Sequence, residues 1–301
     1  MKEIIDIRLR EKWAQKKFGD NFGIKYSEFT RRFLLNTESP MFQKVRNEIR
    51  KEFNKHPGKL VYSSAFEHRL YTKAELANAE LFRLDITACF EPAGEEIGIV
   101  YDESTACDYV FHSWASKIAG EVMTSYCGGG RKQVSDLYLD LQKIPKKKDI
   151  ARTIANEKII SDHLALLFKE NQITGYELRQ VHHYTNKLRN PPLWHQLIVT
   201  GNAGVTVTPT MLGDDLITEG PISHVCPKGP EGHVTGLNLL SEVYISKGAW
   251  DGQDFTATSN LIGYRLGVLA PTPMILITPK VYRLLKEHDI KGYRVEIAHL
   301  V

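Results

Sequence analysis

The chain of 301 residues, 42% hydrophobic and 25% charged, can bury a substantial core, which excludes an intrinsically disordered protein. Its net charge of +3 is too small for the electrostatic attraction that dominates nucleic-acid binding. No apolar run approaches the length of a membrane span, and the charged start of the chain is unlike a signal peptide. Four cysteines are too few for a disulfide framework. We therefore expect a cytoplasmic protein with no membrane partner and no nucleic-acid partner.

The first 70 residues have no counterpart elsewhere in the chain. Residues 1–35 carry mixed charge and are expected to form helix and loop. From Pro40 onward, apolar side chains recur at helical spacing up to position 53, with basic residues between them, which predicts an amphipathic helix that ends near His56. We therefore predict an N-terminal helical module over residues 1–70.

The stretch at the end of the chain occurs twice, with a constant separation of 117 positions from Ile160 to Ile277 and from Gly175 to Gly292. Each copy begins with a short apolar strand and continues with a helix whose apolar side chains recur at helical spacing. A glycine then permits a chain reversal into an alternating strand, so we expect positive φ at both glycines. Each copy is therefore predicted to be a strand-helix-strand unit.

The repeat extends upstream, in four pairs of stretches. Residues 82–87 match residues 195–200, residues 133–139 match 233–239, residues 149–153 match 254–258, and Cys127 precedes Cys226 by 99 positions. Offsets that stay constant within a stretch and change in steps between stretches are what a duplication followed by insertions leaves. The predicted fold class is α+β, with two duplicated α/β halves, residues 71–190 and 191–301, each ending in a strand-helix-strand unit.

Two weak catalytic or binding signals surround Cys127. The run Cys127-Gly128-Gly129-Gly130-Arg131-Lys132 could cradle an anion, but it lacks the glycine spacing and the Lys-Ser/Thr pair of a Walker loop. Cys127 could also be the nucleophile of a thiol-dependent enzyme, with His182 or His183 as its base. The chain contains none of the recognised serine-hydrolase, metalloprotease or kinase signatures, so we expect no catalytic activity.

Metal binding is the stronger chemical interpretation. Cysteine and histidine lie in corresponding irregular segments of the two halves, at Cys107, Cys127, Cys226 and His233, with His224 as a spare. A structural zinc ion takes four such ligands, commonly as two pairs from separate segments. We therefore predict one structural zinc ion that bridges the halves.

The chain resembles the bacterial proteins called double-CXXCG motif proteins, several of which are assigned as immunity proteins in toxin and immunity loci. The matching stretches are residues 127–137, 148–155, 226–229, 236–244 and the two repeated units. The chain departs from the family where Cys107 and Cys127 are separated by an insertion and where Cys226 lacks a second cysteine, for which His233 could substitute.

The resemblance implies a non-enzymatic protein that neutralises a cognate bacterial toxin by occluding a surface. Such interfaces use buried aromatic anchors, for which Trp114 and Trp250 are the predicted partner-binding residues. A zinc-stabilised adaptor or nucleic-acid-binding protein and a thiol-dependent enzyme using Cys127 remain the alternatives.

Overall fold

The computed structural model describes residues 1–56, 61–112, 124–185, 191–213, 226–228, 233, 238–265 and 267–301. In that part of the chain 37% of the residues are in strands, and five short helices accompany several sheets. The predicted fold class is therefore wrong: the chain is a mixed α+β protein dominated by sheet.

The N-terminal module is a sheet with two helices, not a helical module. Its elements are β1 (Lys2–Arg10), α1 (Glu11–Phe18), β2 (Ile24–Lys25), β3 (Thr30–Asn36), α2 (Pro40–Lys55) and β4 (Tyr62–Leu70), and the four strands pair in the order β2-β3-β1-β4. The predicted helix from Pro40 is α2, and the side chain of Ser39 caps its first turn by accepting from the amide of Phe42. The prediction of helix and loop is wrong for residues 2–10, which form β1. This strand alternates buried apolar side chains with charged ones, and the many charges obscure the two-residue period in the sequence.

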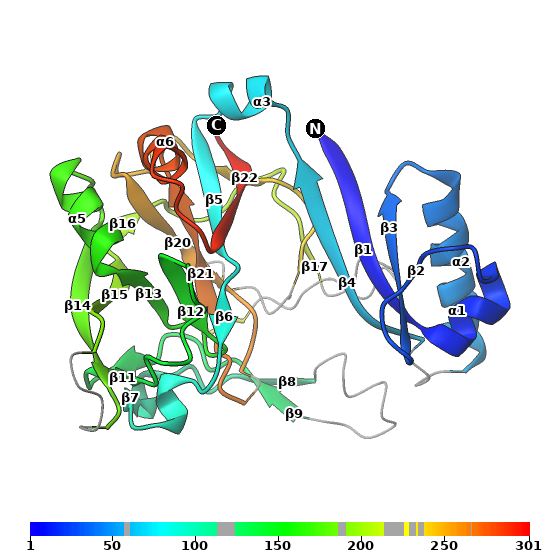
Figure 1. Cartoon of the computed structure of the whole chain (residues 1–301), viewed down its shortest axis with the longest axis horizontal. Coiled ribbons are helices and arrows are strands. Elements are labelled where there is room, and N and C mark those ends of the chain that lie inside the picture. Colours follow the sequence, from blue (N-terminus) through cyan, green and yellow to red (C-terminus); the bar gives the residue numbers. More distant parts are fainter. Residues whose placement is uncertain are drawn as a thin grey trace.

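Two six-stranded sheets make up most of the remaining described chain. In Figure 1 the N-terminal module lies to the right of them. The first sheet has the order β11 (Leu137–Leu139), β14 (Tyr176–His183), β15 (Trp194–Val199), β13 (Lys158–Ser161), β12 (Ile150–Thr153) and β6 (Cys89–Phe90). The second has the order β19 (Val243–Ile245), β22 (Tyr293–Leu300), β5 (Leu81–Ile86), β21 (Thr272–Ile277), β20 (Phe255–Ile262) and β16 (Gly201–Asn202).

The two sheets are equivalent strand by strand, and they exchange one strand. Read along the strand orders given above, neighbouring strands pair in the same sequence in both sheets: one parallel pair, three antiparallel pairs and one parallel pair. Strand β5, from the first half of the chain, lies at the centre of the second sheet, and β15, from the second half, lies at the centre of the first. The halves are therefore interlocked and are not two separate α/β units.

The register corrects one part of the predicted repeat. Strand β11 pairs in parallel with β14, and the strand that pairs in parallel with the equivalent β22 is β19. The counterpart of Leu137–Leu139 is therefore Val243–Ile245, and not residues 237–239. The match failed because two short apolar strands of the same pattern stand close together in the second half of the chain.

The strand-helix-strand units carry the main core. Helix α5 (Asp162–Glu170) lies between β13 and β14, and α6 (Pro279–Glu287) lies between β21 and β22. Both helices end before Gly175 and Gly292, which have positive φ as predicted. The buried faces of α5, α6, β5 and both sheets share one hydrophobic cluster, so burial of apolar surface ties the two halves together.

The remaining described elements are short and connect the sheets. They are α3 (Lys73–Asn78), the 3₁₀ turns η1 (Gly94–Glu96) and η2 (Glu103–Thr105), and the strand pairs β7 (Tyr101–Asp102) with β10 (Lys132–Gln133), β8 (Val110–His112) with β9 (Thr124–Tyr126), and β17 (Leu212–Gly213) with β18 (Asn238–Leu239). Helix α3 follows β4 at the top of Figure 1 and leads into β5. Thr72 and Glu75 cap the first turn of α3 with a capping box.

Candidate metal centre

Three cysteine sulfurs meet in one place. The Sγ atoms of Cys107, Cys127 and Cys226 lie within 4.8 Å of one another, and those of Cys107 and Cys226 are 3.5 Å apart. A tetrahedral zinc ion with Zn–S bonds of about 2.3 Å holds its sulfurs about 3.8 Å apart. All three cysteines are free thiols at these distances, and the cluster could hold a metal ion.

A hairpin explains how Cys107 and Cys127 meet across their insertion. Strands β8 and β9 pair in antiparallel fashion between the two cysteines, so the chain leaves the site and returns to it. At its base the amide of Cys107 donates to the carbonyl of Gly129 (2.8 Å), and the amide of Gly128 donates to the carbonyl of Cys107 (2.9 Å). The long spacing that separates this chain from a Cys-x-x-Cys motif is therefore compatible with one ligand pair.

The second half of the chain supplies Cys226 and His233. These two residues are linked by a hydrogen bond from the amide of Cys226 to the carbonyl of His233 (3.1 Å). The Nδ1 atom of His233 lies 3.0 Å from the sulfur of Cys127, and Nε2 lies 3.2 Å from the carbonyl oxygen of Gly263. With its proton on Nε2 and donated to Gly263, the ring keeps the Nδ1 lone pair directed to the sulfur of Cys127, and a backbone carbonyl orients metal-binding histidines in the same way.

Burial suits these groups for metal ligation better than for acid-base chemistry. Cys127, Cys226 and His233 are buried. Burial raises the pKa of the Cys127 thiol and lowers the pKa of the His233 imidazole. A buried neutral imidazole offers its lone pair, and a bound cation would supply the positive charge that three nearby thiolates need.

A network of charges braces the loops that carry the cysteines. Arg131 and Arg265 each pair with both Glu95 and Glu103, at distances of 2.9 to 3.2 Å. Although burial opposes ionisation, the two arginines lower the pKa of the Glu95 carboxyl. Arg265 comes from the second half of the chain and the other three come from the first, so the network crosses the same boundary as the sulfur cluster.

This network was missed in the sequence because its four members are scattered over residues 95 to 265. It also weakens the case for a phosphate-binding glycine loop. Arg131, one of the two cations of that loop, pairs with two carboxylates, and its guanidinium lies 4.0 Å from the ring centroid of Tyr101. Gly128 and Gly130 have positive φ, which the tight turn after Cys127 requires.

The other predicted site residues lie elsewhere. Trp114 and the spare ligand His224 fall outside the described residues. Trp250 packs against the hydrophobic cluster beneath the second sheet, and its Nε1 is buried without a hydrogen-bond partner in the described part of the chain. His182 lies 3.8 Å from Asp136, and His183 accepts from the amide of Leu141 at 3.3 Å, so both histidines are engaged beside β11, at the edge of the first sheet. The imidazole that lies against Cys127 is that of His233.

Comparison with known proteins adds no family. No family model matches the chain, and no curated protein matches it. Within the described residues, no helix has the length and apolar character needed to cross a membrane.

Proposed function

We propose that this protein is a zinc-stabilised, non-enzymatic binding protein of the immunity type, which neutralises a cognate bacterial toxin by covering one of its surfaces. The observation that carries the proposal is the convergence of Cys107, Cys127 and Cys226 from both halves, with His233 against Cys127. Cys127 and Cys226 lie in stretches that resemble the double-CXXCG immunity proteins, whereas Cys107 and His233 stand where the chain departs from that family. Three thiols with one imidazole form a usual structural zinc set.

The geometry weighs against the thiol-dependent enzyme. Cys127 is fully buried, and burial raises its pKa, whereas a cysteine nucleophile needs a lowered pKa and access to substrate. The closest imidazole is that of His233, whose second nitrogen faces the carbonyl of Gly263, so no carboxylate orients it as a catalytic base.

The zinc site is tested by metal analysis of protein purified without a histidine tag. We expect about one zinc ion per chain in the wild type, and loss of that zinc in Cys226→Ser. Cys89→Ser is the matched control, because Cys89 is an exposed free cysteine outside the cluster. Metal-free, stable wild-type protein would reject the site.

The immunity function needs a separate test. The protein is co-expressed with toxins encoded beside its own gene, and growth and complex formation are measured. We expect rescue of growth and a stable complex on gel filtration with one of them. Unchanged growth arrest and no complex with any neighbouring toxin would reject this function without affecting the zinc site.

A further inference from the structure

A cavity of about 650 Å³ opens where the two six-stranded sheets meet, a volume typical of small-molecule sites. Strands β12 and β13 line it from the first sheet, and β5, β21 and β22 line it from the second. Apolar side chains such as Leu84, Leu269 and Met274 form part of the wall. The site therefore combines apolar surface with charged groups.

The charges that line the cavity are mostly positive. They are Arg83, Asp85, Arg152, Lys158 and Arg294. Asp85 accepts from both Arg83 and Arg294 at 2.9 Å, and Arg83 also pairs with Glu296 at 3.1 Å. The two remaining cations, Arg152 and Lys158, are not compensated in this way.

Arg152 and Lys158 stand directly opposite each other on the antiparallel strands β12 and β13. Arg152 donates to the carbonyls of Ile86 (2.9 Å) and Thr153 (3.3 Å), and the Nζ of Lys158 donates to the carbonyl of Asn156 (3.2 Å). In the described part of the chain neither has a carboxylate within salt-bridge distance. Like charges at directly opposed positions destabilise a sheet, so this pair costs stability unless an anion joins it.

The neighbouring carboxylate of Glu157 does not supply that anion, because it is committed elsewhere. It accepts from the hydroxyl of Thr153, from the hydroxyl of Tyr101 (3.2 Å) and from the amide of Gly94 (3.2 Å). Burial, then the charge of Arg152, lower the pKa of Lys158 to about 8, against a smaller opposing effect of Glu157. The ammonium group is therefore held in an environment that lacks negative charge.

The repeat shows that the fold does not need these cations. In the second sheet the equivalent strands are β20 and β21, and the residues opposed at the same register are Ala257 and Ile275. One copy of the same architecture thus places two small or apolar side chains where the other places Arg152 and Lys158. A pair that is costly and structurally dispensable is characteristic of a binding function.

We propose that this cavity binds a small organic oxyanion, through a phosphate or carboxylate group held by Arg152 and Lys158. The planar guanidinium and the ammonium donate charge-assisted hydrogen bonds to its oxygens, and the apolar wall takes the organic part of the molecule. Gly263 lines the same cavity, and its carbonyl faces His233, so the loop that shapes this wall is also anchored at the metal centre.

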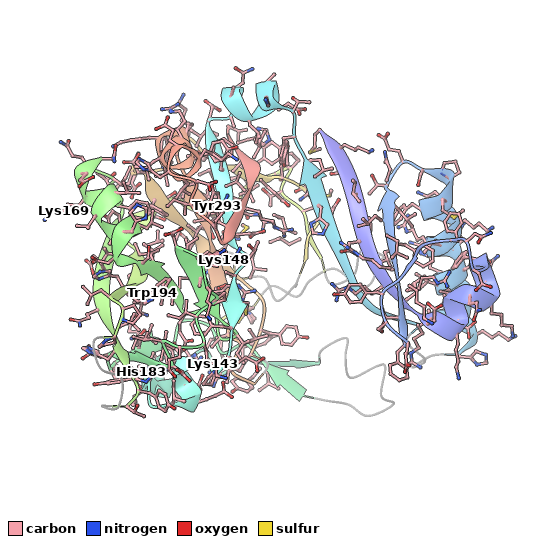
Figure 2. The ribbon with its side chains drawn as sticks, in the orientation of Figure 1. Lys143, Lys148, Lys169, His183, Trp194 and Tyr293 are labelled. Atoms are coloured by element: carbon pink, nitrogen blue, oxygen red, sulfur yellow. The ribbon has the colours of Figure 1, made fainter. Side chains whose placement is uncertain are left out.

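The test is calorimetric titration of full-length protein with inorganic phosphate, phenyl phosphate and benzoate at constant ionic strength. We expect phenyl phosphate or benzoate to bind more tightly than inorganic phosphate, because each adds an apolar group. Arg152→Ala and Lys158→Ile, which install the small and apolar residues of the equivalent register, should weaken binding roughly tenfold or more. Lys169→Met is the matched control, since Lys169 is exposed on α5 and lies at the outer edge of Figure 2.

The melting temperature without ligand separates binding from a structural role. Lys158→Ile should leave it unchanged or raise it, because the substitution removes a half-buried positive charge directly opposite Arg152. Tighter binding of phenyl phosphate identifies a phosphate ligand, and tighter binding of benzoate identifies a carboxylate ligand. Three results would each overturn the proposal: equal affinity in the wild type and in a variant that carries both Arg152→Ala and Lys158→Ile, no binding of any probe, or a lowered melting temperature in Lys158→Ile.

Discussion

The α-carbon of Gly292 faces the main chain of Ile150 so closely that a Cβ at position 292 would lie 2.0 Å from the carbonyl oxygen of Ile150. Gly175, the equivalent residue of the other copy, has the same relationship with Phe255, again at 2.0 Å. Phe255 is the counterpart of Ile150 at the start of the equivalent strand. Each repeated unit thus docks its glycine on the sheet built around the other unit.

We expect Gly175→Ala and Gly292→Ala each to lower the free energy of unfolding by roughly 3 kcal/mol, from strain at positive φ plus the steric overlap. Gly252→Ala is the control, because Gly252 also has positive φ but has no atom within 4 Å of an added Cβ. Its cost should be about 1 kcal/mol. Urea unfolding measures all three, and equal losses would show that the close contact with the carbonyl oxygen contributes nothing.

Because β5 and β15 are exchanged between the sheets, we expect the two halves of the chain to be unable to fold when they are expressed separately. Residues 71–190 and residues 191–301 each lack the central strand of their own sheet, so neither should unfold cooperatively when expressed alone. Co-expressed, they should associate and show a single thermal transition by circular dichroism. Residues 71–301 are the control, since both sheets are complete there and the N-terminal module has its own hydrophobic cluster. A cooperative transition in residues 191–301 alone would contradict the need for β5.

Features that depend on residues close together in the sequence could be predicted from it, whereas strand pairings between distant segments could not. The turn at Gly175 and the helix from Pro40 follow from local patterns, and the structure has both. The exchange of β5 and β15 does not, because equivalent strands have similar apolar patterns and either could complete either sheet. The pairing of Cys107 with Cys127 and Cys226 was predicted from residue type and position in the repeat, and the structure brings these three together. The charged residues around them could be found only from the fold.

The cavity illustrates a signal that the sequence does contain. When the two repeats are aligned so that Asp149 matches Asp254, Arg152 aligns with Ala257. A cation that replaces a small residue in one copy of a repeat marks a departure from the scaffold. What the sequence lacks is the register of β12 against β13, which places Lys158 beside Arg152.

The contact between the N-terminal module and the second sheet, where Arg69 of β4 pairs with Glu296 of β22 at 3.0 Å, should depend on pH. Glu67 is paired with Arg69 at 3.0 Å, and burial, despite Arg69, raises the pKa of Glu67 from 4.5 to about 7. An acid whose pKa is raised in the folded state contributes most stability below its unfolded pKa and loses that contribution as the pH rises through the folded pKa. The free energy of unfolding should therefore fall by about 1–3 kcal/mol as the pH rises from about 4.5 to above about 7.

Glu67→Gln should flatten this part of the profile, measured by urea unfolding between roughly pH 5 and pH 8, which covers most of the interval between the two pKa values. Glu48→Gln is the control. Lys17 and Lys51 lower the pKa of Glu48 to about 2, so Glu48 is ionised in both states across this range and its loss should leave the slope intact. A slope that survives Glu67→Gln would assign the pH dependence to another group.

Removal of the metal should loosen the cysteine loops before it affects the sheets. Cys107, Cys127 and Cys226 belong to none of the four hydrophobic clusters found in the described residues, so apolar burial holds these loops weakly. The proposed zinc ion would supply the missing constraint as a cross-link. After treatment with 1,10-phenanthroline, the amides of Cys107 and Gly128, which are hydrogen-bonded at the base of the hairpin, should exchange faster with solvent.

Hydrogen exchange followed by mass spectrometry makes this measurement, and the strands β13 and β21 provide the internal reference because they belong to the shared core. Cys89→Ser should respond to the chelator as the wild type does, whereas Cys226→Ser should exchange fast in these loops with or without it. If chelation accelerated β13 and β21 as much as the cysteine loops, the metal would stabilise the whole fold and not the junction of the two halves. If chelation changed neither, these thiols would be packing groups, and the metal centre would be rejected.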